Sequence, residues 1–523
     1  MVIASIIVLL IVIALTVALT LLGRWIVIPD PVLIAAAGIA LSFVPVFPAI
    51  HLDPSLVLLV MLPPLVYSAA VELPWEEFRN NLASISLFAV GLVLITSFTV
   101  AAVAHRLMPE IGWAGAFALG SIVSPTDPVA SSSVARRLGL PRRLLAILEG
   151  EGLVNDAVAL TLLSLAATAL QSHSFSIGTA AGRFTLIVVG EAAYGLAVGW
   201  VAACIRQRLR DSRLDASISL ITPFVAYLVP QSLGGSGVLA VVAAGMYIGI
   251  RAPEMLTAEG RLSLAGSWNV LTFLLNGALF LLTGLEFRSV IDGTAGFAAH
   301  RALLYGAAVT LTVVVVRFVW TWPASWATGR FPSNFSRDSR LPDRQVAFLG
   351  WCGMRGGISL AAALSLSAQV PERSLIVFVT ACVIAGTLIV QGAPLPLILR
   401  ALRLDRDAAR EATESLESER RARTAGIQAA LAALDGGGSS VENLREEYKH
   451  RLELLRRGSP EDSGIGPAGY RHERLRIGLD ALSAERGAII GLYRKGSLPE
   501  YVLHRIERDL DLREVRLRRL LPE

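Results

Sequence analysis

Two aspartates, one glutamate and one arginine lie inside long apolar stretches of this chain, where charged side chains are rare. Glu151 and Asp156 begin and end a hexapeptide that runs straight into the uncharged apolar stretch 157–169. An Asp at the centre of a bilayer costs roughly 3 kcal/mol even on mild insertion scales, and chains that keep one generally use it to bind or carry an ion. These residues therefore predict an ion site.

The second aspartate, Asp127, stands between Pro125 and Pro128 in another apolar stretch. Two prolines three residues apart remove backbone donors and stop a regular helix. Inside a membrane such a break is tolerated only where protein or water satisfies the freed carbonyls, which also make good cation ligands. We therefore expect Asp127 and the adjacent Thr126 to belong to the same ion site.

The arginine, Arg355, is flanked by Gly353 and by Gly356 in a third apolar stretch. Glycines at these positions indicate an interrupted helix. A guanidinium does not lose its proton at any relevant pH, so a buried one has to meet an acid. The sequence thus predicts a second broken helix with a permanent positive charge.

Helical geometry assigns different roles to the two acids of the hexapeptide. Glu151 and Asp156 are five residues apart, which places them about 140° apart around a helix. Glu151 shares its face with Asn155, four residues on. We expect Glu151 to form a structural ion pair with Arg355, braced by Asn155, while Asp156 faces the cavity with Asp127.

The elements that must position these residues are transmembrane helices. Apolar residues make up 54% of the chain and charged residues 17%. Because about 20 apolar residues cross a bilayer, the sequence predicts an all-α polytopic membrane protein with about thirteen spans, near 3–22, 26–49, 55–71, 83–105, 112–135, 144–170, 184–205, 216–233, 236–250, 266–286, 302–326, 346–369 and 374–399.

Asp127, Asp156 and Arg355 fall in the fifth, sixth and twelfth of these spans. Each lies about 12 to 18 Å along its helix from the arginine-rich end, which is near the middle of a bilayer. Spans five and twelve correspond if spans 1–6 and 8–13 form inverted repeats. Two interrupted helices at corresponding positions, crossing at midplane, are the expected pattern of a transport site.

Orientation follows from the arginines of the loops. Sixteen lie in one alternating set of loops and five in the other. Because positive residues favour the cytoplasmic side, we expect the N-terminus outside and the C-terminus in the cytoplasm. The net charge of +5 thus reflects topology and needs no nucleic-acid partner. Charged residues replace long apolar runs near 404, so residues 1–403 are predicted to form the transmembrane domain and 404–523 a cytoplasmic helical region.

No resident cofactor is predicted. The three cysteines lie in apolar segments without metal-ligand spacing. The only metal expected is a transported monovalent cation, held transiently by Asp156 and Asp127. The two lysines, Lys449 and Lys495, both follow the last span, so no lysine can release a proton inside the membrane. With Asp156 as the one free carrier, we expect one proton to exchange for one cation.

In several segments the chain resembles the sodium/proton antiporters of the bacterial and eukaryotic electroneutral exchanger family. The resemblance covers residues 1 to about 403 and rests on 148–151, 155–156, 126–128, 236–240, 273–277, 353–356 and 387–392. It implies a plasma-membrane antiporter, not an enzyme, with Asp156 as the main ion and proton carrier and with Asp127 and Thr126 at the crossing of two unwound helices. It also implies a Glu151–Arg355 pair and a homodimer whose core moves in an elevator-like cycle.

One position departs from that family, which usually has Ser where this chain has Gly152. Gly152 can offer a cation only its backbone. The predicted substrate is Na+, with Li+ and K+ also open, and the alternative is a potassium/proton antiporter of the same mechanism. An intramembrane aspartyl protease using Asp127 and Asp156 is a remote alternative. A channel is disfavoured because no repeated selectivity-filter loop is present.

Overall fold

The computed structural model of the chain is built from helices and connecting turns, with no strand among the residues it describes. Those residues are 2–23, 25, 28–45, 52–127, 129, 132, 139–172, 177–209, 211–255, 258–294, 297–330, 341–433, 445–446, 448–450, 452–453, 479, 482–483, 485, 510 and 512–514. Helices dominate because a backbone in lipid has to satisfy its own polar groups.

The chain divides into two compact units, Met1–Glu411 and Ala412–Glu523. The last long described helix, α20 (Leu404–Ala433), begins in the first unit and continues into the second. Within the first unit, the carboxylate of Glu411 accepts a hydrogen bond of 2.9 Å from the backbone N–H of Arg142. Most of the predicted helical region beyond α20 lies outside the described residues.

The helices of residues 1–411 follow one another with short connections. In chain order they are α1 (Val2–Gly23), α2 (Asp30–Ser42), η1 (Leu56–Met61), α3 (Leu62–Glu72), α4 (Trp75–Asn80), α5 (Leu82–Ser86), η2 (Leu87–Leu92), α6 (Val93–Leu107), η3 (Pro109–Ile111), α7 (Gly112–Val123), α9 (Arg142–Ser172), α10 (Ile177–Arg208), α11 (Ser212–Ser232), α12 (Val238–Met255), α13 (Ala258–Leu285), α14 (Phe287–Asp292), α15 (Ala299–Arg330), α16 (Asp343–Trp351), α17 (Gly357–Leu364), α18 (Arg373–Thr387), η4 (Leu388–Gly392) and α19 (Leu395–Ala401).

Six helical stretches of the described chain are long and apolar enough to cross a membrane. They are Leu82–Leu107, Arg142–Ala169, Ala180–Arg208, Ser263–Asp292, Ala299–Thr328 and Arg373–Ala401, and shorter apolar helices lie at Leu10–Gly23, Asp30–Ser42, Leu56–Glu72 and Val238–Ala252. All of them fall where the hydrophobic pattern predicts spans. The all-helical, multi-pass character of the sequence prediction is therefore confirmed.

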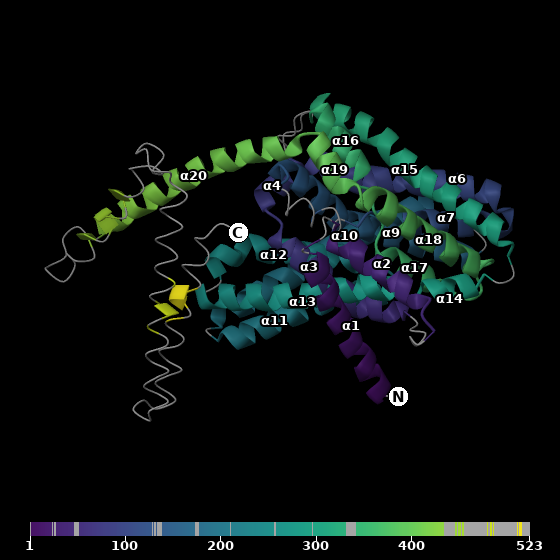
Figure 1. Cartoon of the computed structure of the whole chain (residues 1–523), viewed down its shortest axis with the longest axis horizontal. Helices are drawn as coiled ribbons and strands as arrows, with labels where there is room; N and C mark the ends of the chain where they lie inside the picture. The colour runs from purple at the N-terminus through teal and green to yellow at the C-terminus, as the bar shows by residue number, and fades with distance from the viewer. Residues whose placement is uncertain are drawn as a thin grey trace. The chain divides into compact units, whose positions relative to one another are not determined.

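Within the first unit the helices pack as two groups (Figure 1). One group, here called the scaffold, contains α1 to α3 and α10 to α13. The other, called the core group, contains α5 to α9 and α15 to α19. Close helix approach in the scaffold depends on small residues: a Cβ on Gly195 of α10 would overlap the carbonyl oxygen of Ala240 in α12.

Two helices of the core group are interrupted, as the sequence predicts. Helix α7 ends at Val123, directly before the segment with Pro125 and Pro128, and Asp127 is already outside any helix. The predicted continuation of this span to 135 falls mostly on residues outside the described set. The second interruption separates α16 from α17 at residues 352–356, where Gly356 is fully extended.

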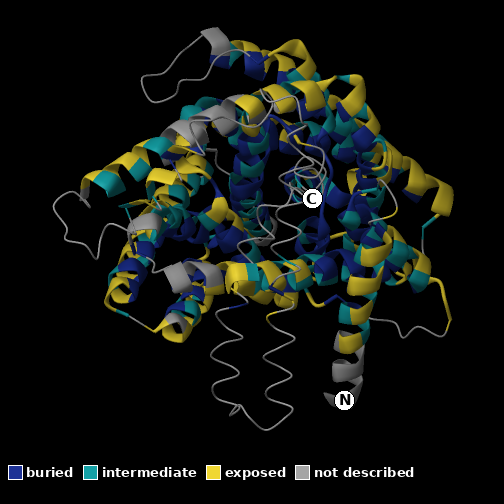
Figure 2. Cartoon of the chain, turned by 60° about the vertical axis from the view of Figure 1, so that its left-hand side comes forward, coloured by how far each residue is buried: buried dark blue, intermediate teal, exposed yellow. Residues whose placement is uncertain are grey.

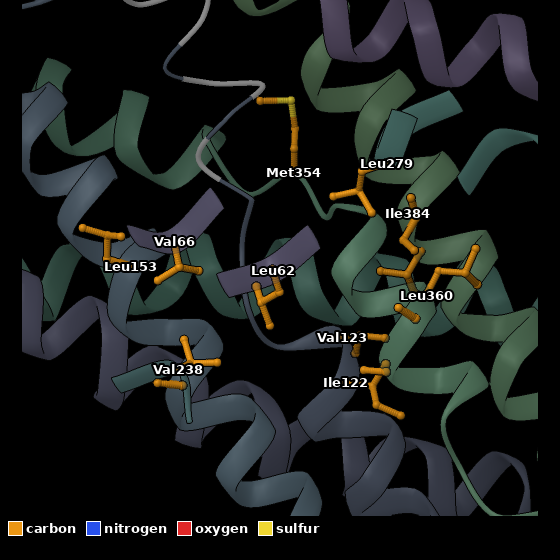
Figure 3. Packing of buried hydrophobic residues seen from close by; sticks show 14 of the residues in the cluster. Leu62, Val66, Ile122, Val123, Leu153, Val238, Leu279, Met354, Leu360 and Ile384 are labelled. Atoms are coloured by element: carbon orange, nitrogen blue, oxygen red, sulfur yellow. The ribbon is translucent and has the colours of Figure 1, made fainter. Parts of the chain in front are cut away.

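Buried residues gather on the inward parts of these helices (Figure 2). Around the two interruptions, Ile122 and Val123 from α7 belong to one hydrophobic cluster with Leu360 from α17 and Ile384 from α18 (Figure 3). This packing fixes the ends of the broken helices against a third, uninterrupted helix. The polar residues of the breaks are thereby held in place by apolar neighbours.

Candidate ion-binding site

Helix α9 presents its two acids to different surroundings. Glu151 is 1% exposed, whereas Asp156 is partly exposed. Glu151 makes several hydrogen bonds inside the core group. Asp156 makes no hydrogen bond or salt bridge among the described residues and lines a small cavity instead. The five-residue spacing thus separates the acids as helical geometry requires.

Glu151 forms its ion pair with Arg317 of α15, and not with Arg355 as predicted. Nη1 of Arg317 donates to Oε1 of Glu151 at 2.5 Å and Nη2 donates to Oε2 at 3.0 Å. Both side chains are almost fully buried, at 1% and 2% exposure. A two-point arrangement of this kind is the strong form of the Arg–carboxylate contact.

The sequence analysis missed Arg317, although a signal was present. Arg317 is the single charged residue in the apolar stretch 302–329, and a lone charge in an apolar span is the same observation that drew attention to Asp156. Its Nε also donates to the carbonyl of Leu349 at 3.0 Å, near the end of α16. Arg317 therefore ties α9 to the interrupted helix through one side chain.

Arg355 satisfies the other broken helix instead of an acid. Its Nη1 donates to the carbonyl oxygen of Ser124 at 2.5 Å, and its backbone N–H donates to the hydroxyl of Thr387 at 3.1 Å. The physical reason lies in Pro128: it has no N–H, so the carbonyl four residues earlier lacks its usual helical donor. Arg355 supplies one.

The two breaks bond to each other reciprocally. While Arg355 donates to Ser124, the backbone N–H of Asp127 donates to the carbonyl of Met354 at 2.9 Å. The carboxylate of Asp127 accepts a hydrogen bond of 2.8 Å from the N–H of Val129. It also lies against Gly356, where a Cβ would overlap it. Asp127 therefore sits directly on the break that carries Arg355.

Thr126 and Asn155 link the break to the ion pair. The hydroxyl of Thr126 donates to Oε1 of Glu151 at 2.7 Å. Nδ2 of Asn155 donates to the carbonyl and to the hydroxyl of Thr126, at 2.9 and 3.0 Å. The predicted brace from Asn155 to Glu151 is therefore indirect and passes through Thr126.

Polar atoms without partners collect near this crossing. In the described part of the chain, Oδ1 of Asn155 and both Nε and Nη2 of Arg355 are buried without a hydrogen-bond partner. Both side-chain amide atoms of Gln391 in η4 are also buried without a hydrogen-bond partner among the described residues. Buried polar groups are normally hydrogen-bonded, so a cluster of exceptions indicates a place where water, an ion or an alternative arrangement is accommodated.

Two cavities meet beside Asp156. The small one, of about 10 Å³, is lined by residues of α7, α9 and α17 together with Pro125. The large one, of about 1230 Å³, lies between the core group and the scaffold, with Phe117 and Ser164 on one wall and Leu58 and Tyr227 on the other. Leu160 and Leu163 line both cavities, so the large cavity leads toward Asp156. Gly152 is buried one turn before Asp156 and adds only backbone.

Comparisons with known proteins agree with this geometry. Residues 10–401 match the sequence model of a family described as "Sodium/hydrogen exchanger, transmembrane". The chain belongs to the sodium/hydrogen exchanger family. Its members are transporters, so an enzymatic reading such as an intramembrane protease is set aside.

Two relatives illustrate the family. An uncharacterized Na+/H+ exchanger of Mycobacterium tuberculosis is 34% identical, covering 95% of this chain and 93% of its own. A "sodium, potassium, lithium and rubidium/H+ antiporter" of Bacillus pumilus is 31% identical, covering 88% of this chain and 70% of its own. Among solved structures, the sodium proton antiporter MjNhaP1 of Methanocaldococcus jannaschii has a TM-score of 0.61 at 16% identity, over 77% of this chain and 99% of that one. The last likeness shows a shared fold.

Proposed function

We propose that this protein exchanges monovalent cations for protons across the cell membrane, with Asp156 binding the proton and the cation in turn. The observation that carries the proposal is the carboxylate of Asp156, which has no bonding partner among the described residues and lines a cavity in the core group. A buried carboxylate without a fixed partner can compensate its charge with either a proton or a cation. Asp127, Thr126, Asn155 and Gly152 are the neighbouring residues proposed to complete the site.

The charges around the crossing support an electroneutral exchange of one for one. Glu151 and Arg317 neutralise each other permanently. Arg355 and Asp127, which occupy adjoining breaks, contribute one positive and one negative charge. Asp156 then decides the net charge: the core is neutral with a proton or a monovalent cation bound, and carries −1 when empty. Moving the empty form through lipid is costly, so only loaded forms cross.

The count depends on Arg317. With Arg355 as the one arginine of the core, as the sequence suggested, its pairing with Glu151 would leave Asp127 and Asp156 without a compensating cation. Because Arg317 takes Glu151, Arg355 is left to balance Asp127. Neither arginine can release its proton at physiological pH, and the residues before the tail contain no lysine. One carrier group therefore gives one proton per cation.

The two packed groups are the proposed moving parts. The large cavity is lined by both of them, so sliding the core group along the scaffold would close this access and open one on the opposite side. This is an elevator-type cycle of a protein with about thirteen spans in inverted repeats. We further propose a homodimer, with the N-terminus outside and the C-terminus in the cytoplasm, as the arginine distribution favours.

Na+ is the proposed main substrate, and Li+ and K+ complete the range to be tested. The Bacillus pumilus relative carries sodium, potassium, lithium and rubidium in its name, which keeps the potassium/proton alternative open for this chain. Hard cations such as Na+, Li+ and K+ prefer oxygen ligands, which include carboxylate, carbonyl and hydroxyl oxygens. The residues around Asp156 offer all three.

Flux in proteoliposomes tests the proposal. Vesicles with an internal pH dye should show proton movement when an outward or inward Na+ gradient is imposed, and Li+ and K+ should be compared at equal concentration. The steady-state pH gradient should not change when a potassium–valinomycin potential is applied. One net charge per cycle would add about 2.3 kcal/mol per 100 mV, so a gradient that follows the voltage contradicts one-for-one exchange.

A further inference from the structure

The small cavity beside Asp156 has an unusual polar wall. Ten residues line it, and only Ser121, Asp156 and Ser359 carry polar side chains. Its volume of about 10 Å³ is at the lower limit for holding one water molecule. Any species bound there would therefore be coordinated by few protein oxygens.

Thr96, Ser97 and Ser325 have buried hydroxyls without a partner, but many other buried hydroxyls in the described helices bond to their own backbone. Each donates to a carbonyl three or four residues earlier, as Ser and Thr do in membrane helices. Examples among the described residues are Ser121 to Phe117, Thr161 to Ala157, Thr283 to Leu279, Thr380 to Ile376 and Thr387 to Val383.

Ser359 differs from these hydroxyls. It is 3% exposed, yet among the described residues its hydroxyl has no hydrogen-bond partner. The reason is its position as the third residue of α17. The carbonyls three and four residues earlier belong to Gly356 and Arg355, inside the break, where Gly356 is extended with φ −115° and ψ −176°. The carbonyl of Gly356 accepts the backbone N–H of Ser359 at 3.2 Å, and the hydroxyl donates to neither carbonyl.

The interruption of the helix thus leaves Ser359 with an uncommitted oxygen next to an uncommitted carboxylate. We infer that Ser359 is a ligand of the transported cation, and that its hydroxyl oxygen and the carboxylate of Asp156 bind the ion together in the small cavity. The inference rests on the proposed function of Asp156 as carrier. It assigns to α17 a direct part in cation binding.

The assignment explains how this chain manages with Gly152. A glycine one turn before Asp156 supplies no side-chain oxygen from α9. Ser359 supplies one from the opposite wall. A hydroxyl oxygen binds a cation more strongly than it binds the proton of a neutral carboxyl group. Ser359 should therefore stabilise the cation-loaded form of Asp156 more than its protonated form.

The experiment compares Ser359→Ala, Ser121→Ala, Asp156→Asn and the wild-type protein, each full-length in proteoliposomes, with Na+ as the probe. Ser359→Ala should raise the KM for Na+ about three- to tenfold, as expected for the loss of one neutral polar ligand, with kcat little changed. Ser121→Ala enlarges the same cavity by the same atom but removes a hydroxyl that is bonded to the backbone, so its KM should change little.

The pH profile gives a second readout that a purely structural role would not move. At a fixed Na+ concentration, weaker binding of Na+ means that a lower proton concentration is enough to displace it from Asp156. The acidic limb of the Ser359→Ala profile should therefore shift to higher pH, by about half to one pH unit for the same change in KM. A variant that is only partly folded would lose rate without this shift.

The outcomes separate the two proposals. If the wild-type protein moves no protons in a Na+ gradient, the proposed function itself fails. If the wild-type exchanges and Asp156→Asn does not, but Ser359→Ala keeps the wild-type KM, the assignment of Ser359 is overturned while that of Asp156 stands. Equal increases of KM in Ser359→Ala and Ser121→Ala would also overturn it, because cavity size and not a ligand oxygen would then explain the change.

Discussion

Glu151 and Asp156 lie on one helix, five residues apart, in opposite environments. Glu151 is buried, and its carboxylate accepts two hydrogen bonds from Arg317 and one from Thr126. Asp156 borders a cavity and has no bonding partner in the described part of the chain. The same chemical group thus has fixed partners in one place and no described partner in the other, and the direction in which each faces from α9 makes the difference.

We propose that Glu151 is a structural charge and Asp156 the charge that takes part in transport. A buried acid whose charge is matched at every step can join helices permanently. A buried acid with access to water and no matching base has to acquire a proton or a cation to be neutral. Variants of the two acids should therefore fail in different ways.

The largest effect is expected at Asp156. Replacing it with Asn keeps the shape but removes the titrating group, so exchange should fall by at least about a hundredfold, the general scale for loss of an essential acid–base group. The melting temperature should stay near that of the wild-type protein, because no described bond is lost. Flux in proteoliposomes and thermal unfolding in detergent measure the two quantities. Near-normal exchange would remove Asp156 from the carrier role.

Arg317→Ala should fail through stability instead. It leaves Glu151 buried and unpaired, which costs about 3 to 5 kcal/mol of folding stability. Adding Glu151→Gln removes the stranded charge and keeps an acceptor for the hydroxyl of Thr126, so the double variant should recover part of the melting temperature.

Arg355→Ala is the matched control for this pair. It removes another buried arginine, but one whose side chain donates to the carbonyl of Ser124. Glu151→Gln should therefore not restore its melting temperature. Rescue of Arg355→Ala, and none of Arg317→Ala, would support the partnership that the sequence suggested over the one the structure has.

Much of the fold could be predicted from the sequence because the membrane imposes simple rules. Apolar length located the helices, Pro125 and Pro128 located one break, and Gly353 and Gly356 located the other. Helical spacing also separated Glu151 from Asp156 correctly. Each of these inferences depends only on local residues and on the requirement that backbone groups in lipid be satisfied.

The partner of Glu151 could not be predicted because it is a matter of tertiary packing. Two arginines, Arg317 and Arg355, were available, and nothing local to either says which one α9 will meet. The carbonyl of Ser124 separates them, since among the described residues it accepts a hydrogen bond from the side chain of Arg355. The uncommitted hydroxyl of Ser359 was also out of reach, because it follows from the backbone geometry of Gly356.

A smaller and reversible effect is expected from pH, and it distinguishes the two acids again. Protons and Na+ compete for Asp156 while Glu151 stays paired. On the acidic side of the optimum, each unit by which the pH is lowered should therefore raise the apparent KM for Na+ about tenfold, as competition at one site requires. At high pH the rate should fall because the return step lacks protons. An apparent KM that rises about a hundredfold per unit would mean that two groups titrate together, with Asp127 the second.

The smallest effect should come from giving α9 the hydroxyl that it lacks. Gly152 and Asp156 are one turn apart on the same face, so the side chain of Gly152→Ser can approach the cation that Asp156 holds. The KM for Na+ should fall about two- to fivefold, within the range for one neutral polar contact, with kcat similar. The gain should be larger in the Ser359→Ala background, where the first hydroxyl is missing. Titration of Na+ in proteoliposomes at constant pH measures both values. An equal gain in the two backgrounds would show that the hydroxyls act independently, and no gain in either would place residue 152 outside the reach of the bound cation.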